Sequence, residues 1–248
     1  MIICKSAAEI EKLRRSGHIA REILEEMRVL VRPAMRTADL EEYAERRIRQ
    51  FGVKPAFKGY RGYPCCLCVS VNEEVVHGIP SKRVLREGDI VSLDMGVIAG
   101  GYYGDSALTT PVGEISDSLQ RLLRVTEESL QLAIERARAG NRLGDVSAAV
   151  QRHAEEAGYS IVKEFVGHGI GRDLHEDPQV PNFGEAGRGP VLKEGMVFAI
   201  EPMVNAGTNE IRVLDDRWTA VTADGACSAH FEHMVAVTRN GPDVLTRL

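Results

Sequence analysis

One short sequence pattern occurs twice and constrains the fold more than any other feature. The copies span residues 84–94 and 191–201, and each reads as a Leu-basic-Glu-Gly turn followed by an apolar run typical of a buried strand. Each copy ends in an acid, Asp94 in the first and Glu201 in the second. Because a carboxylate is not buried without a partner, each acid either pairs with a nearby Arg or Lys, or two related halves bring their acids to one centre.

The rest of the chain repeats a common plan around these copies. Apolar residues at helical spacing predict a helix between Ser6 and Pro33, one that opens at Thr37, and helices over 117–139 and 145–157. Each half also carries strands, expected at 69–72 and 75–80 in the first half. We expect two helix-helix-strand-strand halves, near 1–110 and 111–248. No linker rich in Pro or Ser divides them, so residues 1–248 should form one pseudo-symmetric domain.

Composition excludes several classes of protein. The net charge of -5 and the pI near 5.9 give no basic footprint for nucleic acid. No apolar run is long enough to span a membrane, and the N-terminus lacks the architecture of a signal peptide. The odd number of cysteines, five, favours free thiols in a reducing compartment. We therefore expect a cytoplasmic protein without a membrane or nucleic-acid partner.

A second group of acids points to metal chemistry. Gly100 and Gly101 predict a tight turn between Asp94 and Asp105, so that the two acids share one face of a hairpin and, with suitable register, stand side by side. Glu201 and Glu232 are also expected at strand ends, and His168 lies in a run flanked by glycines, Gly167 to Gly171. Four converging carboxylates repel one another unless cations lie between them. Two divalent ions (Mn, Fe(II), Co or Zn) suit an oxygen-rich site with one His, and such a pair supports hydrolysis.

Taken in order, the motifs resemble those of type I methionine aminopeptidases, metallopeptidases of the pita-bread fold. The resemblance covers nearly the whole chain. It rests on His77-Gly78-Ile79-Pro80, Asp94-Met95-Gly96, Gly104-Asp105, Gly167-His168-Gly169-Ile170-Gly171, Leu174-His175-Glu176, Ala199-Ile200-Glu201-Pro202 and Phe231-Glu232-His233. It implies an α+β fold in which helices pack on a curved antiparallel sheet. It also implies an enzyme that removes the initiator methionine from N-terminal methionyl peptides and nascent chains, favours a small second residue, contacts the ribosome transiently and is a monomer.

The same resemblance assigns roles to individual residues. The metal ligands would be Asp94, Asp105, His168, Glu201 and Glu232, with Asp105 and Glu232 bridging both ions. Glu201 would also shuttle protons, His77 would lie beside the scissile peptide, and His175 would stabilise the developing oxyanion. The methionine pocket would be formed by Tyr60, Tyr63, Cys68, Leu174 and Trp218, with Phe57 nearby. Asn72 and Ser228 match positions that hold a monovalent cation in some relatives.

Three positions depart from the family pattern. Asp173 and Leu174 stand where relatives have a small residue followed by Phe. A branched aliphatic could loosen selectivity for methionine, and Asp173 could raise the pKa of His175. His230, where relatives usually carry an amide, is expected on the same strand face as Glu232. It is interpreted as a residue that orients a ligand more readily than as a sixth ligand.

Other readings remain open at this point. An Xaa-Pro dipeptidase or aminopeptidase of the same fold usually carries a long N-terminal domain, whereas this chain begins at the catalytic part. A pita-bread binding protein without catalytic activity would lack metal ligands, and all five candidates are present here. The absence of an N-terminal zinc-binding extension favours a bacterial enzyme. Cys65, Cys66 and Cys68 lack a second cluster at zinc-site spacing, so one pocket thiol and two loop thiols are expected.

Overall fold

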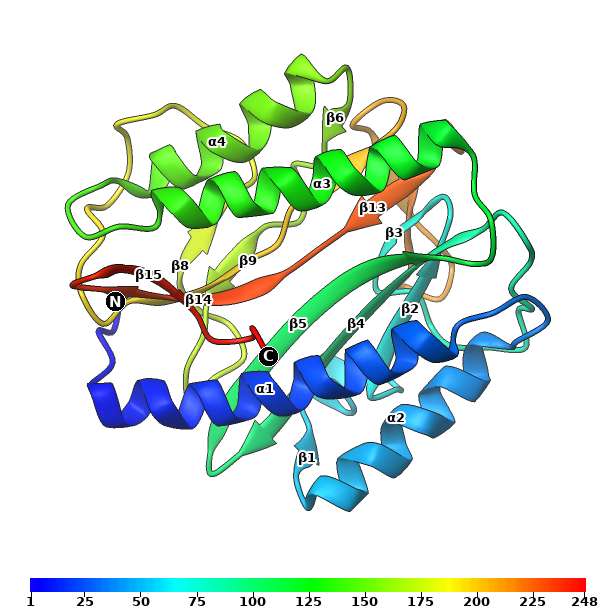
Figure 1. Cartoon of the computed structure of the whole chain (residues 1–248), viewed down its shortest axis with the longest axis horizontal. Coiled ribbons are helices and arrows are strands. Elements are labelled where there is room, and N and C mark those ends of the chain that lie inside the picture. The colour runs from blue at the N-terminus through cyan, green and yellow to red at the C-terminus, as the bar shows by residue number, and fades with distance from the viewer.

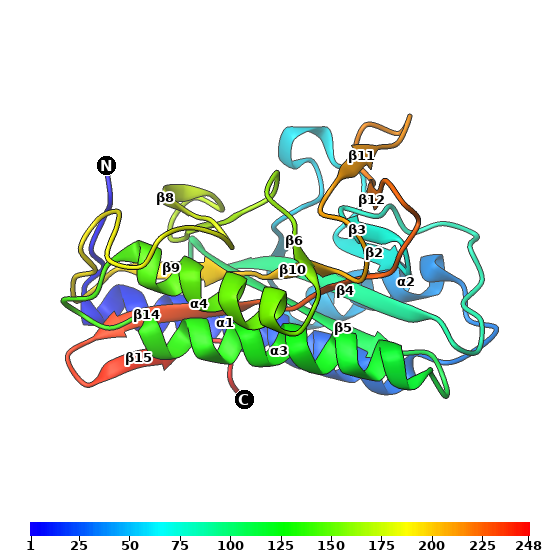
Figure 2. The same cartoon turned by 90° about the horizontal axis from the view of Figure 1, so that it is seen from above.

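Four long helices flank the strands in the computed structural model, which describes residues 1–248. They are α1 (Ala7–Leu30), α2 (Thr37–Phe51), α3 (Asp117–Arg136) and α4 (Leu143–Glu156). Figure 1 shows α1 and α2 along one side of the strands and α3 and α4 along the other. Seen from above, α1, α3 and α4 form one layer, and β8, β11 and β12 lie on the opposite side (Figure 2). None of the helices combines the length and apolar character needed to cross a membrane.

Backbone hydrogen bonds divide the strands into four antiparallel sheets. The first contains β1 (Lys54–Pro55), β2 (Leu67–Val71), β4 (Ile90–Ala99) and β5 (Tyr102–Pro111). The second joins β6 (Ser160–Ile161), β10 (Met203–Asn205) and β13 (Ser228–His230), and the third joins β3 (Glu74–Val76), β11 (Ile211–Val213) and β12 (Ala220–Thr222). The fourth contains β7 (Gly167–Gly169), β8 (Glu176–Val180), β9 (Val197–Ile200), β14 (His233–Thr238) and β15 (Gly241–Val244). The strand expected at 75–80 is therefore shorter than predicted and ends at Val76.

Capping residues explain where the helices begin. Ser6 and Glu9 form a capping box at the start of α1, a pattern that the sequence itself carries. The second helix of each half starts with a matching pair, Arg36 with Asp39 at α2 and Arg142 with Asp145 at α4. Arg36 also bridges to Val84 and Arg142 to Val191, the first residues of the two copies of the repeated pattern. This shared contact supports the proposed half-repeats near 1–110 and 111–248, which stay a prediction.

The β4–β5 hairpin has the predicted turn, but its acids do not end strands. Gly100 and Gly101 both have positive φ, as a two-residue hairpin loop requires. The expectation that Asp94 and Asp105 end their strands is wrong, because the ladder continues without a break past both residues. Asp94 lies opposite Ala107 and Asp105 opposite Gly96. The two acids therefore share a face as diagonal neighbours and do not stand directly side by side.

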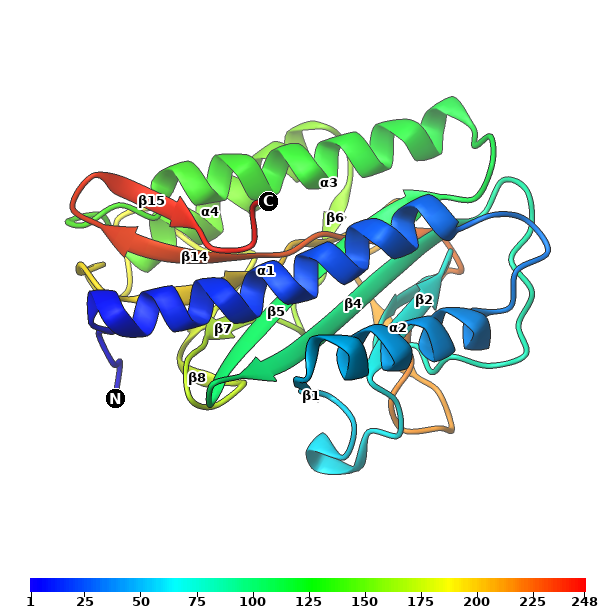
Figure 3. The same ribbon diagram turned by 60° about the horizontal axis from the view of Figure 1, so that its bottom comes forward.

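A seam joins the strands of the first half to those of the second. Figure 3 shows β14 running between α1 and α3, and β5 crossing behind α1. Glu232 lies between β13 and β14, and its backbone N–H donates to the carbonyl of Ala107 in β5 at 2.9 Å. The Ser106 hydroxyl donates to the Glu232 carbonyl at 3.0 Å. The seam thus holds one acid of the second half beside those of the hairpin.

Candidate active site

A cavity of about 280 Å³ brings the predicted site residues together. It is lined by all of the metal, catalytic and pocket candidates: Tyr60, Tyr63, Cys68, His77, Asp94, Asp105, His168, Leu174, His175, Glu201, Trp218 and Glu232, together with Phe57. Four further lining residues were missed from the sequence, namely Arg61, Glu164, Phe165 and Val166. Their only signal is proximity in the chain, since each lies within three residues of a predicted site residue or of the Gly167–Gly171 motif.

The acids meet around His168. The Nε2 atom of His168 lies 3.8 Å from Oδ2 of Asp105 and 3.6 Å from Oε1 of Glu201. Ligand atoms of Asp105, His168 and Glu232 all lie within 4.8 Å of one another. One carboxylate oxygen each of Asp94, Asp105 and Glu232 is buried without a hydrogen-bond partner in the protein.

The protein supplies no Lys or Arg to these four acids. None of them forms an ion pair with a Lys or Arg side chain, so the reading that each acid has its own basic partner is wrong. Burial raises the pKa of Asp94 to about 7 and that of Glu201 to about 8. Burial and the neighbouring acids hold the pKa values of Asp105 and Glu232 well above the usual range. Orphaned buried oxygens with one imidazole form a donor set that fits divalent cations.

Glycines on either side of His168 allow β7 to pack tightly. A Cβ atom at Gly167 would lie 2.3 Å from the carbonyl of Ala199, and one at Gly169 would lie 2.2 Å from that of Asp177. The Nδ1 atom of His168 lies 2.9 Å from the Gly169 carbonyl, which can only accept, so Nδ1 carries the hydrogen. Burial lowers the pKa of His168 to about 3. The neutral ring thus presents the Nε2 lone pair to the acids.

Aromatic rings build the rest of the cavity wall. Tyr63 and Trp218 pack edge to face with centroids 5.1 Å apart, and His77 packs edge to face on Phe165, also at 5.1 Å. The Tyr60 hydroxyl lies 2.7 Å from Nδ1 of His175. The centroid of the His175 ring is 4.3 Å from that of His168. The aromatic wall therefore adjoins the acid centre directly.

The departures from the family pattern lie in different surroundings. Leu174 is a buried part of the wall, whereas Asp173 is exposed. The expected rise in the pKa of His175 is wrong, because burial, and then the charge of Arg61, lower that pKa, and Asp173 is not among the causes of the shift. His230 is buried, and its Nε2 lies 3.6 Å from Oε2 of Glu201.

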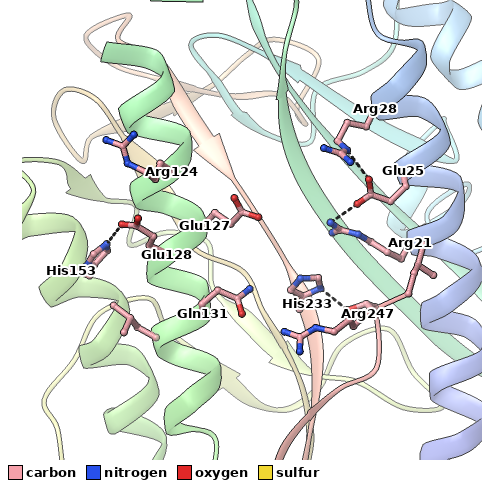
Figure 4. A pocket seen from close by; sticks show the side chains of 13 residues that line it. Arg21, Glu25, Arg28, Arg124, Glu127, Glu128, Gln131, His153, His233 and Arg247 are labelled. Carbon is pink, nitrogen blue, oxygen red and sulfur yellow. Dashed lines mark hydrogen bonds and ion pairs between the residues drawn. The ribbon is translucent and has the colours of Figure 1, made fainter. Parts of the chain in front are cut away.

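The remaining candidates lie outside the cavity. Asn72 and Ser228 meet where the Ser228 backbone N–H donates to the Asn72 carbonyl at 2.8 Å. All five cysteines are free. Cys68, in β2, lines the cavity, whereas the loop residues Cys65 and Cys66 do not. A larger hollow of about 880 Å³ between α1 and α3 is lined mainly by charged residues, among them Arg21, Glu25, Arg124 and Arg247 (Figure 4). It contains none of the predicted site residues.

Comparison with known proteins identifies the family. The sequence matches the profile of metallopeptidase family M24 over residues 11–239. The chain belongs to metallopeptidase family M24. A relative in Bacillus subtilis, methionine aminopeptidase 1, is 52% identical over 248 residues that cover 100% of both chains. The solved structure of a methionine aminopeptidase from Thermotoga maritima superposes with a TM-score of 0.98 at 48% identity, again over 100% of both chains.

A more distant solved structure shares only the fold. A prolidase from Pyrococcus furiosus superposes with a TM-score of 0.79 at 24% identity, covering 99% of this chain and 66% of that one. That likeness shows the shared fold alone. The predicted family, the α+β pita-bread fold and the assignment as a metal-dependent aminopeptidase are thus confirmed for this M24 member.

Proposed function

We propose that this M24 enzyme hydrolyses the first peptide bond of peptides and nascent proteins that begin with methionine, with two divalent metal ions, and that it favours a small second residue. The observation that carries the proposal is one cavity in which an aromatic and aliphatic wall adjoins four buried acids. A soft thioether packs well against aromatic faces. A cavity of about 280 Å³ lies near the lower end of ligand pockets, which favours a short second residue.

Five residues would hold the metal ions: Asp94, Asp105, His168, Glu201 and Glu232. Asp105 and Glu232, whose ligand atoms lie together, are proposed to bridge them. Bound divalent ions of this kind (Co, Mn, Fe(II) or Zn) polarise a carbonyl and lower the pKa of water. Glu201 is proposed to carry protons during hydrolysis, because its carboxylate lines the cavity and lies beside His168 at the acid centre.

His175 is proposed to donate a hydrogen bond to the oxygen of the scissile carbonyl. A Tyr60 hydroxyl that donates to Nδ1 leaves the hydrogen of the neutral ring on Nε2. A donor fixed in this way stabilises the negative charge that develops on the oxygen. Because no other part of the ring is then free to accept a proton, His175 acts in this proposal as an electrostatic stabiliser.

His77 is proposed to assist departure of the leaving amine. Burial lowers the pKa of His77 to about 4, so the ring is neutral near pH 7. A neutral ring would give the hydrogen of one nitrogen to the departing amine and take up a proton on the other. Edge-to-face packing against Phe165 and Trp218 holds its orientation. The backbone at His77 has a φ of 61°, an uncommon conformation for a residue other than glycine that occurs where function fixes a side chain.

The broader setting follows from the same proposal. The substrates would be newly made chains in the cytoplasm, met in transient contact with the ribosome, and the enzyme would work as a monomer. A monovalent cation near Asn72 and Ser228 would be structural, because those residues lie outside the cavity.

The deciding experiment compares hydrolysis of Met-Ala-Ser, Met-Leu-Ser, Leu-Ala-Ser and an Xaa-Pro peptide. Protein stripped of metal is titrated with Mn, Fe(II) and Co. We expect metal-dependent release of methionine from Met-Ala-Ser and much slower cleavage of Met-Leu-Ser and Leu-Ala-Ser. Preferred cleavage of the Xaa-Pro peptide would assign the prolidase activity instead. Bound metal without cleavage of any peptide would favour a binding role.

A further inference from the structure

We propose that His230 is a positioning residue that donates its Nε2 hydrogen to Oε2 of Glu201 and so keeps Oε1 directed at His168. The inference rests on the proposed function, in which Glu201 serves the metal centre. The Glu201 carboxylate lies between two imidazoles. Its Oε1 is 3.6 Å from Nε2 of His168, and its Oε2 is 3.6 Å from Nε2 of His230.

The two histidines differ in which ring nitrogen carries the hydrogen. The Gly169 carbonyl fixes the hydrogen of His168 on Nδ1, which leaves the Nε2 lone pair free to bind a metal. His230 has no such fixed partner, and its Nε2 is buried without a hydrogen-bond partner. Glu201 is ionised when it serves as a metal ligand, and a lone pair at that nitrogen would then face an oxygen that only accepts. A hydrogen there is therefore the favoured state, and His230 acts as a donor.

The distance between Nε2 of His230 and Oε2 of Glu201 suits a hydrogen bond that forms after a small movement of the Glu201 side chain. At 3.6 Å the nitrogen and oxygen are a few tenths of an ångström beyond a direct hydrogen bond. Hydrogen bonds at catalytic sites are often long until the complex forms. A small rotation of the Glu201 side chain brings Oε2 within reach and leaves the backbone of both residues in place.

The His230 backbone is held in register with the acid centre. Its N–H donates to Oγ1 of Thr109 at 2.9 Å, and the same hydroxyl donates to the His230 carbonyl at 2.8 Å. Thr109 also pairs with the Ser92 hydroxyl at 2.8 Å. Ser92 and Asp94 share one face of β4, and Thr109 and Asp105 share one face of β5. The hydroxyl pair therefore fixes His230 against the two strands that carry these acids.

A sixth metal ligand is the alternative role for His230, and two substitutions separate the roles. His230→Gln retains an N–H donor near the same position but removes the imidazole lone pair. His230→Leu removes both. His233→Gln is the matched control, because His233 lies three residues away, hydrogen-bonds Thr246 Oγ1 at 2.8 Å and faces the hollow between α1 and α3 (Figure 4).

The experiment measures Co(II) affinity and stoichiometry by calorimetry and the visible spectrum of the Co(II) protein, with circular dichroism to verify folding. We expect His230→Leu to weaken Co(II) binding about 10- to 100-fold at unchanged stoichiometry. His230→Gln should retain most of the affinity, and His233→Gln should match the parent protein. Equal losses in the Gln and Leu variants would identify a ligand and overturn the proposal. Parent-like affinity in His230→Leu would overturn it too.

The metal readout separates this inference from the proposed function. No peptide is present in the calorimetric experiment, so the role of His230 is decided by the metal alone. A parent protein that binds Co(II) but does not cleave Met-Ala-Ser would overturn the proposed function and leave the His230 result intact.

Discussion

Glu176 and the four acids of the centre differ in whether the chain supplies a positively charged partner. Glu176, beside the cavity, forms an ion pair with Lys5, and the two side chains are 9% and 4% exposed. Its other oxygen accepts the backbone N–H of Arg172 at 2.9 Å. The four acids of the centre have no Lys or Arg partner, and Asp94, Asp105 and Glu232 each keep a buried oxygen without a hydrogen-bond partner. The contrast indicates that the chain supplies a counter-charge where an acid is structural and leaves it out where metal ions are to bind.

The largest effect is expected from Glu201→Gln. Activity should fall by about a thousandfold or more, because metal-assisted catalysis contributes several kcal/mol. The fold should persist, since the change removes one of four mutually repelling acids. The measurement is kcat for Met-Ala-Ser alongside a thermal melt in chelator. Full activity would exclude the two-metal mechanism, and a large drop in the melting temperature would show that the acid centre resembles the Glu176 pair.

A second prediction concerns the ion pair between Lys5 and Glu176. Lys5→Met leaves Glu176 buried without its counter-charge, and breaking a buried pair costs about 3–5 kcal/mol of unfolding free energy. Urea unfolding measures the loss. The double variant Lys5→Met with Glu176→Gln should recover most of it, because the charge is then gone. A single variant as stable as the parent would remove the distinction between the two sets of acids.

A third change leaves every carboxylate in place. His77→Ala should slow turnover about a hundredfold through loss of proton transfer. Metal content, measured by elemental analysis after gel filtration, should stay at the parent value because His77 is not among the proposed ligands. Loss of metal in this variant would place His77 within the metal centre.

The smallest effect on stability is expected at Glu9, whose carboxylate accepts hydrogen bonds at the start of α1. Hydrogen bonds from the Ser6 backbone, the Ser6 hydroxyl and Tyr102 lower the pKa of Glu9 from 4.5 to about 2. The folded state then binds the proton more weakly than the unfolded state, so the stabilisation is present above pH 4.5 and is lost as the pH falls toward 2. Glu9→Gln should be less stable than the parent at pH 7, with the difference shrinking on acidification. A constant difference in urea melts from pH 3 to 7 would contradict this.

The sequence contains the family motifs as short local patterns, and the resemblance that they carry implied most of the residues that line the cavity. Capping at Ser6 and the Gly100–Gly101 turn were predictable for the same reason: a few neighbouring residues determine them. The positions of Asp94 and Asp105 within their strands were not, since strand length depends on the pairing of β4 with β5. Arg61 and Phe165 were missed because only the folded chain brings them to the cavity. The sign of the shift at His175 depends on burial, which Asp173 as a sequence neighbour did not reveal.

The seam at Ala107 and Glu232 has a consequence for unfolding. Asp94 and Asp105 belong to one hairpin, whereas Glu201 and Glu232 follow strands formed much later in the chain. A cation held by both pairs would act as a reversible cross-link that closes a long loop of the polypeptide, and closing a long loop restricts the unfolded chain most. Metal ions would thus raise the resistance of the whole molecule to unfolding, and their removal would loosen the two halves together.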